Sequence, residues 1–228
     1  MHSPKLGLMV PINNTTMDPE LRAWLPPGSH CEVRRIPRGK GLLTHETVPA
    51  YCDAALSLAA DYAPMTLDAV VYGCTAAGFL GGPASDAQLR ERLASITGKP
   101  VVTTANAMIE ALQAEGVNRL AVVTPYLEAV NRQLTAYLAA YDIEVRRFAT
   151  FAAPDTDALG RITGTQVTEL ARQTMADDCD ALFIGCSQLP THGIVDALRL
   201  EFQRPVWSSI RATAWSVYRS LDGRAARA

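Results

Sequence analysis

The sequence lacks any hydrophobic run long enough to cross a membrane. No apolar stretch reaches the roughly 18 to 20 residues of a membrane-spanning helix, and residues 1–11 lack the basic and hydrophobic portions of a secretory signal peptide. An excess of charge of one sign is also missing, because 21 Lys and Arg residues stand against 23 Asp and Glu residues. We therefore expect a cytoplasmic protein with neither a nucleic-acid partner nor a membrane partner.

The usual motifs of nucleotide and zinc sites are missing as well. The chain has no GxGxxG or P-loop pattern that could hold a nucleotide phosphate. Cys186 and His192 have no CxxC or HExxH companion, whereas zinc needs three or four ligands. Five cysteines in a chain of 228 residues do not suggest a disulfide framework, because 48% hydrophobic residues supply an ample core. We expect no cofactor and no metal, and some of the thiols are candidates for chemistry.

Short apolar runs alternate along the chain with stretches of helical periodicity. Continuous hydrophobicity is typical of strands that are buried on both faces of a parallel sheet. The expected strands are residues 6–10, 69–72, 101–103, 120–123, 144–148, 181–184 and 206–207. The expected helices are residues 45–62, 85–95, 107–115, 127–141, 164–177 and 212–221. This alternation predicts an α/β fold with right-handed crossovers.

Three segments recur in the same order about half a chain apart. They are residues 68–75 with 180–187, residues 8–11 with 122–125, and residues 99–104 with 204–209. This spacing is far too long for a solenoid. It predicts two lobes related by a pseudo-two-fold axis, each a parallel sheet flanked by helices. We place the first lobe at residues 1–105, with the C-terminal segment as a candidate to complete its sheet, and the second at 106–228.

Cys74 and Cys186 hold the same position in the two halves. Each follows a glycine at the end of an expected strand, and ligands of open α/β sheets bind beyond the carboxyl ends of strands. Backbone N–H groups at such a turn predict a thiol pKa below the usual value of about 8.5. Two thiols on opposite faces of a planar substrate can add a group and exchange a proton. Cys31, Cys52 and Cys179 lack such a repeat, and we assign them to packing.

Polar residues lie close to both thiols in this arrangement. Asn14 follows the first strand, where its amide could hold a carboxylate or an enolate, or else form a turn or a helix cap. Tyr126 occupies the equivalent loop of the second half, where it donates its hydroxyl to substrate or packs between the lobes. Thr75 and Ser187 offer hydroxyl and backbone donors directly beside the thiols.

At these residues the sequence resembles the aspartate/glutamate racemase superfamily, whose members have two duplicated α/β lobes with one cysteine from each in the cleft. Residues 10–17, VPINNTTM, are similar to the opening motif of the maleate cis-trans isomerases, which implies a substrate-binding role for Pro11. Tyr126 and Asn131 resemble the second-lobe motif of those enzymes. Their carboxylate-binding asparagine corresponds to Thr156 here. Arylmalonate decarboxylases keep only the second cysteine, whereas this chain has both, so the resemblance implies a two-thiol reaction.

The resemblance implies an isomerase acting on a small dicarboxylate, with Cys74 as the nucleophile and Cys186 as the acid and base. The first role goes to Cys74 because small residues follow it, whereas Pro190 removes a backbone donor after Cys186. A racemase of a hydantoin, amino-acid-like or malonate-type carbon acid is the alternative enzyme. A non-catalytic carboxylate-binding protein is the alternative of another class. The sequence leaves open the substrate and the formation of a homo-oligomer.

Overall fold

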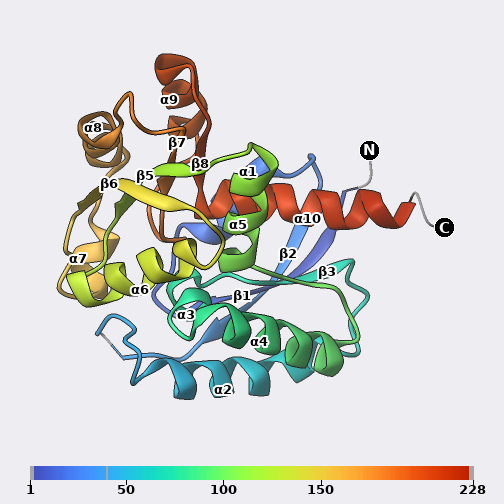
Figure 1. Ribbon diagram of the computed structural model, residues 1–228. Helices are drawn as coiled ribbons and strands as arrows, with labels where there is room; N and C mark the ends of the chain where they lie inside the picture. Colours follow the sequence, from blue (N-terminus) through green and yellow to red (C-terminus); the bar gives the residue numbers. More distant parts are fainter. Residues whose placement is uncertain (1–2, 40, 226–228) are drawn as a thin grey trace.

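Two four-stranded parallel sheets, each flanked by helices, make up the computed structural model, which describes residues 3–39 and 41–225 (Figure 1). The strands are β1 (Lys5–Pro11), β2 (His30–Ile36), β3 (Ala69–Tyr72), β4 (Val101–Thr103), β5 (Arg119–Thr124), β6 (Glu144–Thr150), β7 (Ala181–Ile184) and β8 (Val206–Ser208). The helices are α1 (Met17–Trp24), α2 (Val48–Ala59), the 3-10 helix η1 (Ala60–Tyr62), α3 (Thr75–Phe79), α4 (Gly82–Thr97), α5 (Thr104–Ala114), α6 (Glu128–Ala139), α7 (Thr156–Gly160), α8 (Gly164–Thr174), α9 (Ile194–Phe202) and α10 (Ser209–Ala225). The expected α/β fold with two similar lobes is confirmed.

The two sheets have the same topology. The strand order is β2-β1-β3-β4 in the first and β6-β5-β7-β8 in the second, with all pairs parallel. The chain therefore reverses its direction of winding between β1 and β3, and again between β5 and β7. Crevices at such reversal points, beyond the carboxyl ends of the strands, are where open α/β sheets bind ligands.

The repeated aspartates show how closely the halves correspond. Asp68 accepts a hydrogen bond of 2.7 Å on its carboxylate from the backbone N–H of Lys5, which begins β1. Asp180 accepts one of 2.7 Å from the backbone N–H of Arg119, which begins β5. Each aspartate thus fixes the start of its central strand, which explains why this residue recurs in the sequence.

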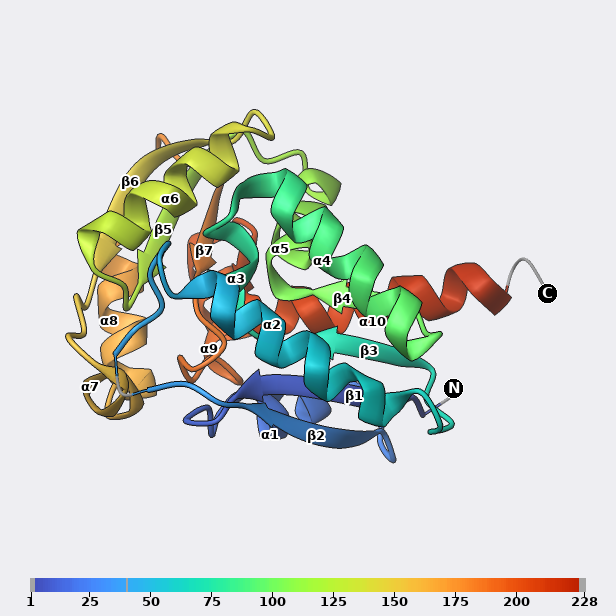
Figure 2. The same ribbon diagram turned by 90° about the horizontal axis from the view of Figure 1, so that it is seen from below.

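Helices cover both faces of the first sheet. Helices α2 and α4 lie against one face, and α1 and α10 lie against the other (Figures 1 and 2). The C-terminal segment adds the helix α10 to this lobe, where it contacts β3 and β4 although it follows β8. Helix α5 follows β4 but also contacts β8. Helices α5 and α10 pack side by side between the two sheets. Our division into residues 1–105 and 106–228 remains a prediction.

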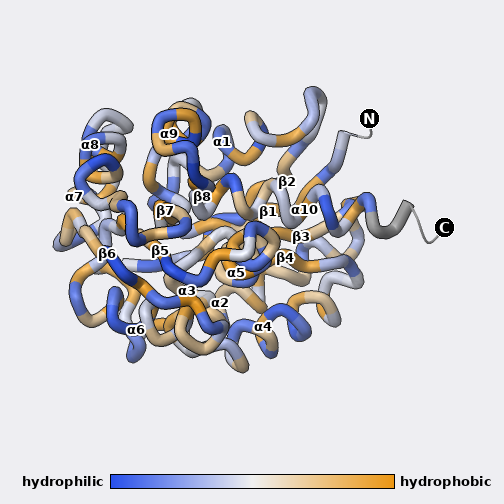
Figure 3. The backbone as a smooth tube through the Cα atoms, turned by 45° about the horizontal axis from the view of Figure 1, so that its top comes forward, coloured by the Kyte–Doolittle hydropathy of each residue, from blue (hydrophilic) through white to orange (hydrophobic). Residues whose placement is uncertain are grey.

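The central strands form the apolar interior. Strands β3 and β7 are buried along their whole length, and β1 is buried except for Lys5. The tube in Figure 3 is accordingly hydrophobic along β1, whereas much of β6, an edge strand without a buried residue, is hydrophilic. Within the described part of the chain, no helix is both long and apolar enough to cross a membrane.

One strand and several helices of the structure were not predicted from the sequence. Strand β2 was missed because it lies at an edge of the sheet, so polar residues alternate with the buried Cys31 and Ile36 instead of forming an apolar run. Helix α1 begins with an acidic turn that contains Pro19, and proline is compatible with a first turn. Helix α9 follows Gly193, whose left-handed backbone begins it, and buries Val195 and Leu198. The short helices α3 and α7 were not expected either.

Candidate active site

The two repeated cysteines lie at equivalent turns, directly after the central strands β3 and β7. A glycine before each thiol continues the hydrogen bonds between the neighbouring strands. The N–H of Gly73 donates to the Met9 carbonyl at 2.7 Å, and that of Gly185 donates to the Val123 carbonyl at 2.8 Å. A side chain at Gly73 would place its Cβ 2.5 Å from the sulfur of Met17 and 2.9 Å from the Met9 carbonyl. Glycine is therefore required there for the turn to pack against β1.

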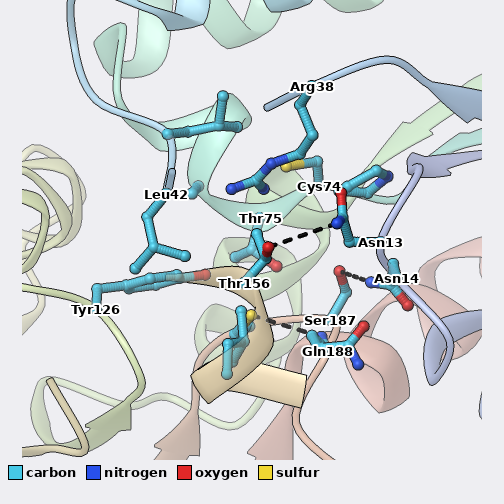
Figure 4. Close-up of a pocket in the computed structure, with 15 residues that line it drawn as sticks. Asn13, Asn14, Arg38, Leu42, Cys74, Thr75, Tyr126, Thr156, Ser187 and Gln188 are labelled. Atoms are coloured by element: carbon cyan, nitrogen blue, oxygen red, sulfur yellow. Dashed lines mark hydrogen bonds between the residues drawn. The ribbon is translucent and has the colours of Figure 1, made fainter. Parts of the chain in front are cut away.

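One cavity brings the predicted site residues together (Figure 4). All eight of them line it: Pro11, Asn14, Cys74, Thr75, Tyr126, Thr156, Cys186 and Ser187. Seven further residues also line it: Asn13, Arg38, Leu42, Leu43, Ala76, Leu159 and Gln188. Both thiols line this cavity and are almost fully buried, with Cys74 5% and Cys186 8% exposed.

The backbone differs at the two cysteines. Cys74 is extended, with a φ of −129°, and comes directly before helix α3. Cys186 has a φ of 116°, in the left-handed region that favours glycine. Its N–H donates to the hydroxyl of Ser209 at 3.0 Å, and its sulfur accepts from the N–H of Gln188 at 3.5 Å. The duplicated thiols therefore have distinct local settings, which a comparison of the repeats does not reveal.

The expectation of a lowered thiol pKa is wrong for both cysteines. Burial raises the pKa of Cys74 above its ordinary value, and this exceeds the opposing effects of the Ala77 N–H and the Arg38 charge. Burial likewise raises the pKa of Cys186, although the N–H groups of Gln188 and Leu189 favour its thiolate. Pro190 thus leaves two donors to Cys186. The backbone amides reduce the cost of ionisation, but they do not outweigh the loss of water.

Each thiol has a tyrosine hydroxyl close by. The Tyr126 hydroxyl lowers the pKa of Cys186, and the Tyr51 hydroxyl lowers the pKa of Cys74, in both cases against the larger effect of burial. Tyr126 is held by Asn131, whose amide donates to the Tyr126 carbonyl at 2.9 Å and accepts from Thr124 at 2.7 Å. Asn131 therefore shapes the loop that carries Tyr126. Tyr51, on α2, was not among the predicted site residues.

Asn14 forms the turn considered for it, at the start of α1, and also contacts the second lobe. Its side-chain oxygen accepts from the N–H groups of Thr16 and Met17, at 3.0 and 2.9 Å, where α1 begins. Its side-chain nitrogen donates to the hydroxyl of Ser187 at 3.0 Å, and Ser187 donates to the Gly73 carbonyl at 2.8 Å. The oxygen of Asn14 and the proton of Ser187 are thus engaged, and Asn14 has one remaining N–H for a ligand.

The other hydroxyl and amide groups of the cavity differ in their hydrogen-bond partners. The hydroxyl of Thr75 is buried and has no hydrogen-bond partner within the described ranges. Thr156 accepts from Asn13 at 3.4 Å across the lobes. Gln188 forms two bonds with Thr15, one of 3.0 Å to its N–H and one of 3.2 Å to its hydroxyl. These contacts hold the walls of the cavity together.

Arg38 was not among the predicted site residues. This residue follows β2 and extends its guanidinium toward the cavity, beside Cys74 (Figure 4). Because β2 was not recognised, nothing indicated that the loop after it lies at the carboxyl edge of the first sheet. Residues 30–36, with an apolar side chain at positions 31, 33 and 36, contained the signal that could have revealed it.

This chain is similar in sequence and in fold to known proteins. The family described as arylmalonate decarboxylase matches residues 6–228. The maleate isomerase of Nocardia farcinica is 30% identical, over 96% of this chain and 90% of that protein. A structure of that organism's maleate cis-trans isomerase, a Cys-to-Ser variant with a covalently bound succinylcysteine intermediate, has a TM-score of 0.88 and 28% identity, over 96% of this chain and 93% of that one.

A second similar structure is a maleate isomerase from Pseudomonas putida S16 with maleate, a Cys-to-Ala variant. It has a TM-score of 0.85 and 25% identity, over 96% of this chain and 92% of that one. The proteins compared share the fold along nearly their whole length. This chain is therefore an isomerase-type enzyme of the aspartate/glutamate racemase superfamily and belongs to the arylmalonate decarboxylase family.

Proposed function

We propose that the chain catalyses the cis-trans isomerisation of a small unsaturated dicarboxylate such as maleate. The observation that carries this proposal is the pairing of two buried thiols in one cavity whose described lining residues include an arginine but no Asp or Glu. Such a cavity favours an anion. Its thiols supply a nucleophile and a proton donor for the same substrate.

In the proposed reaction the thiolate of Cys74 forms a bond to one carbon of the double bond. The π electrons move to the neighbouring carbon, which takes a proton from the thiol of Cys186. The carbons are then joined by a single bond about which the substrate rotates. The Cys186 thiolate removes the proton, the double bond forms again and the carbon–sulfur bond breaks, so no redox change occurs and no proton is lost overall.

The electrostatics support this division of roles. Negative charge on Cys186 raises the pKa of Cys74, so the two thiols resist ionising together. A state with one thiolate and one thiol is what addition and protonation require. The guanidinium of Arg38 lies beside Cys74 (Figure 4) and opposes the burial effect there. We therefore assign Cys74 as the nucleophile.

Several donors are available to stabilise the substrate and the negative charge that develops on it. They are the free hydroxyl of Thr75, the remaining N–H of Asn14 and the hydroxyl of Tyr126. Pro11 and Thr156 contribute shape to the walls. Because both thiols must stay reduced, a reducing compartment such as the cytoplasm suits this chemistry.

Proton NMR of the protein with maleate in deuterium oxide tests the proposal. We expect fumarate to appear, and deuterium in it would report the proton exchange. Hydantoins, aspartate and arylmalonates under the same conditions test racemisation and decarboxylation. Turnover of one of these without any isomerisation of maleate would overturn the proposal in favour of that reaction. Binding of dicarboxylates that persists without either thiol, with no turnover, would favour a binding protein.

A further inference from the structure

Arg38 carries the one charge among the described residues that line the cavity. The other lining residues that contact the interior are apolar or neutral, including Leu42, Leu43 and Leu159. A guanidinium is a fixed positive charge at any working pH. The cavity therefore carries net positive charge whenever both thiols are protonated, and an anionic substrate group would neutralise it.

The hydrogen bonds of Arg38 leave part of its guanidinium unused. One terminal nitrogen donates to the Gly41 carbonyl at 2.6 Å, within the same loop. The Nε atom is buried and has no hydrogen-bond partner within the described ranges. A buried donor without a partner is costly, and a guanidinium presents its donors as a planar fork that matches a carboxylate. The unpartnered Nε therefore points to a ligand carboxylate.

Arg38 also lies within electrostatic reach of both reacting groups. Its charge lowers the pKa of Cys74 and of Cys186, against the larger opposite effect of burial in each case. In Figure 4 the guanidinium is beside the Cys74 thiol, whereas Asn14 and Ser187 are on another side of the cavity. A substrate carboxylate on Arg38 would thus sit next to the thiol that we assign as nucleophile.

We propose that Arg38 determines substrate specificity, by pairing through its guanidinium fork with one carboxylate of the substrate. The enzyme would accordingly select doubly charged dicarboxylates over their monoamides. The neutral donors Thr75 and Asn14 would hold the second carboxylate. This inference rests on the proposed isomerase function, which it deepens by naming the residue that recognises one of the two substrate charges.

The test compares Arg38→Met with the native protein on two substrates, maleate and its monoamide maleamate. We expect Arg38→Met to lower kcat/KM for maleate by about 10- to 100-fold, mainly through KM, because a charged hydrogen-bonded pair is lost. Turnover of maleamate should change by less than about threefold when its amide occupies the Arg38 position. Arg132→Met, which removes an exposed arginine of α6 that pairs with Glu128, is the matched control and should leave both values unchanged.

Arg38→Lys keeps the charge and removes the fork, so its loss on maleate should be intermediate. Thermal unfolding of both variants shows whether they fold. If Arg38→Met does not fold, Arg38→Lys provides the test in its place. An equal loss on both substrates, with a shifted pH profile, would overturn the proposal, because Arg38 would then act through the thiols alone. Unchanged kinetics on maleate would overturn it as well.

A failure of the proposed function is distinguishable from a failure of this inference. If the native protein turns over neither compound, calorimetric binding of succinate and of its monoamide succinamate decides the role of Arg38. A loss of succinate affinity of about tenfold or more in Arg38→Met, with no loss for succinamate, would support dicarboxylate recognition without isomerisation. Equal affinities of the variant and the native protein for succinate would overturn it.

Discussion

The hydroxyl of Ser187 donates a hydrogen bond of 2.8 Å to the carbonyl of Gly73. These residues are the direct neighbours of Cys186 and Cys74, so one buried bond joins the two turns that carry the thiols. Asn14 completes the connection, because its amide donates to the same hydroxyl at 3.0 Å. The distance between the thiols is thus tied to a contact between the lobes.

Ser187→Ala should reduce turnover by loosening this contact. The substitution leaves the Gly73 carbonyl and one N–H of Asn14 buried without a partner, which we expect to cost about 1 to 3 kcal/mol of unfolding free energy. We expect kcat to fall more than KM rises, because the spacing of the thiols matters most during the reaction. Urea unfolding and steady-state kinetics measure the two effects. Loss of stability with unchanged kcat would show that Ser187 has a purely structural role. Recovery of kcat by Ser187→Thr would show that its hydroxyl positions the two thiols.

Removal of either repeated thiol should abolish turnover. We expect Cys74→Ala and Cys186→Ala each to lower kcat by at least about 10³-fold, as for other residues that act as a unit. Circular dichroism should show that both variants keep the fold.

The other three cysteines provide the controls. Cys31→Ala, Cys52→Ala and Cys179→Ala should retain activity, because none of these residues lines the cavity. Substantial activity in either variant of the repeated pair would contradict the paired-thiol mechanism.

Alkylation by iodoacetamide should be slow at neutral pH and should accelerate as the pH rises toward 9 and above. Only the thiolate reacts, and burial raises the pKa of both Cys74 and Cys186 above the ordinary value of a thiol. We expect Cys74 to be labelled first, because Arg38 lies beside it, and maleate to protect it. Mass spectrometry of partly labelled protein shows the order. Label on Cys186 first would reverse the assigned roles, and a rate that levels off below pH 8 would contradict the raised pKa.

Asp86 should make stability depend on pH between about 4 and 7. Burial raises its pKa from 3.8 to about 6, although Thr103 donates to its carboxylate at 2.8 Å. A raised pKa means that the folded state holds the proton more tightly. Protonation of Asp86 therefore stabilises the folded state. This stabilisation is complete below pH 3.8 and is lost as the pH rises through about 6.

Relative to Asp86→Asn, the native protein should therefore lose about 2 kcal/mol of unfolding free energy between pH 4 and pH 7. Urea unfolding of both proteins at several pH values measures the difference. Parallel pH curves for the two proteins would show that Asp86 does not titrate in this range.

The sequence predicted the parts of the fold that depend on local pattern and repetition. Buried strands such as β3 and β7 are continuous apolar runs, and the recurrence of Asp68 at Asp180 located both turns at the cavity. Edge strand β2 is half solvated, so it lacked that pattern, and Arg38 was lost with it. The raised thiol pKa values depend on how completely the folded lobes exclude water, which no short motif encodes.

The backbone of Cys186 reveals a trade-off between stability and activity. A φ of 116° is strained for any residue with a side chain and natural for glycine. Among the 20 residues, glycine would thus relax this turn, yet it would remove the sulfur. Stability alone would favour glycine at position 186, so under the proposed function the catalytic thiol is kept there at a cost in folding free energy. Cys74, whose φ is −129°, carries no such strain, so the fold bears a backbone cost for one of the two thiols and not for the other.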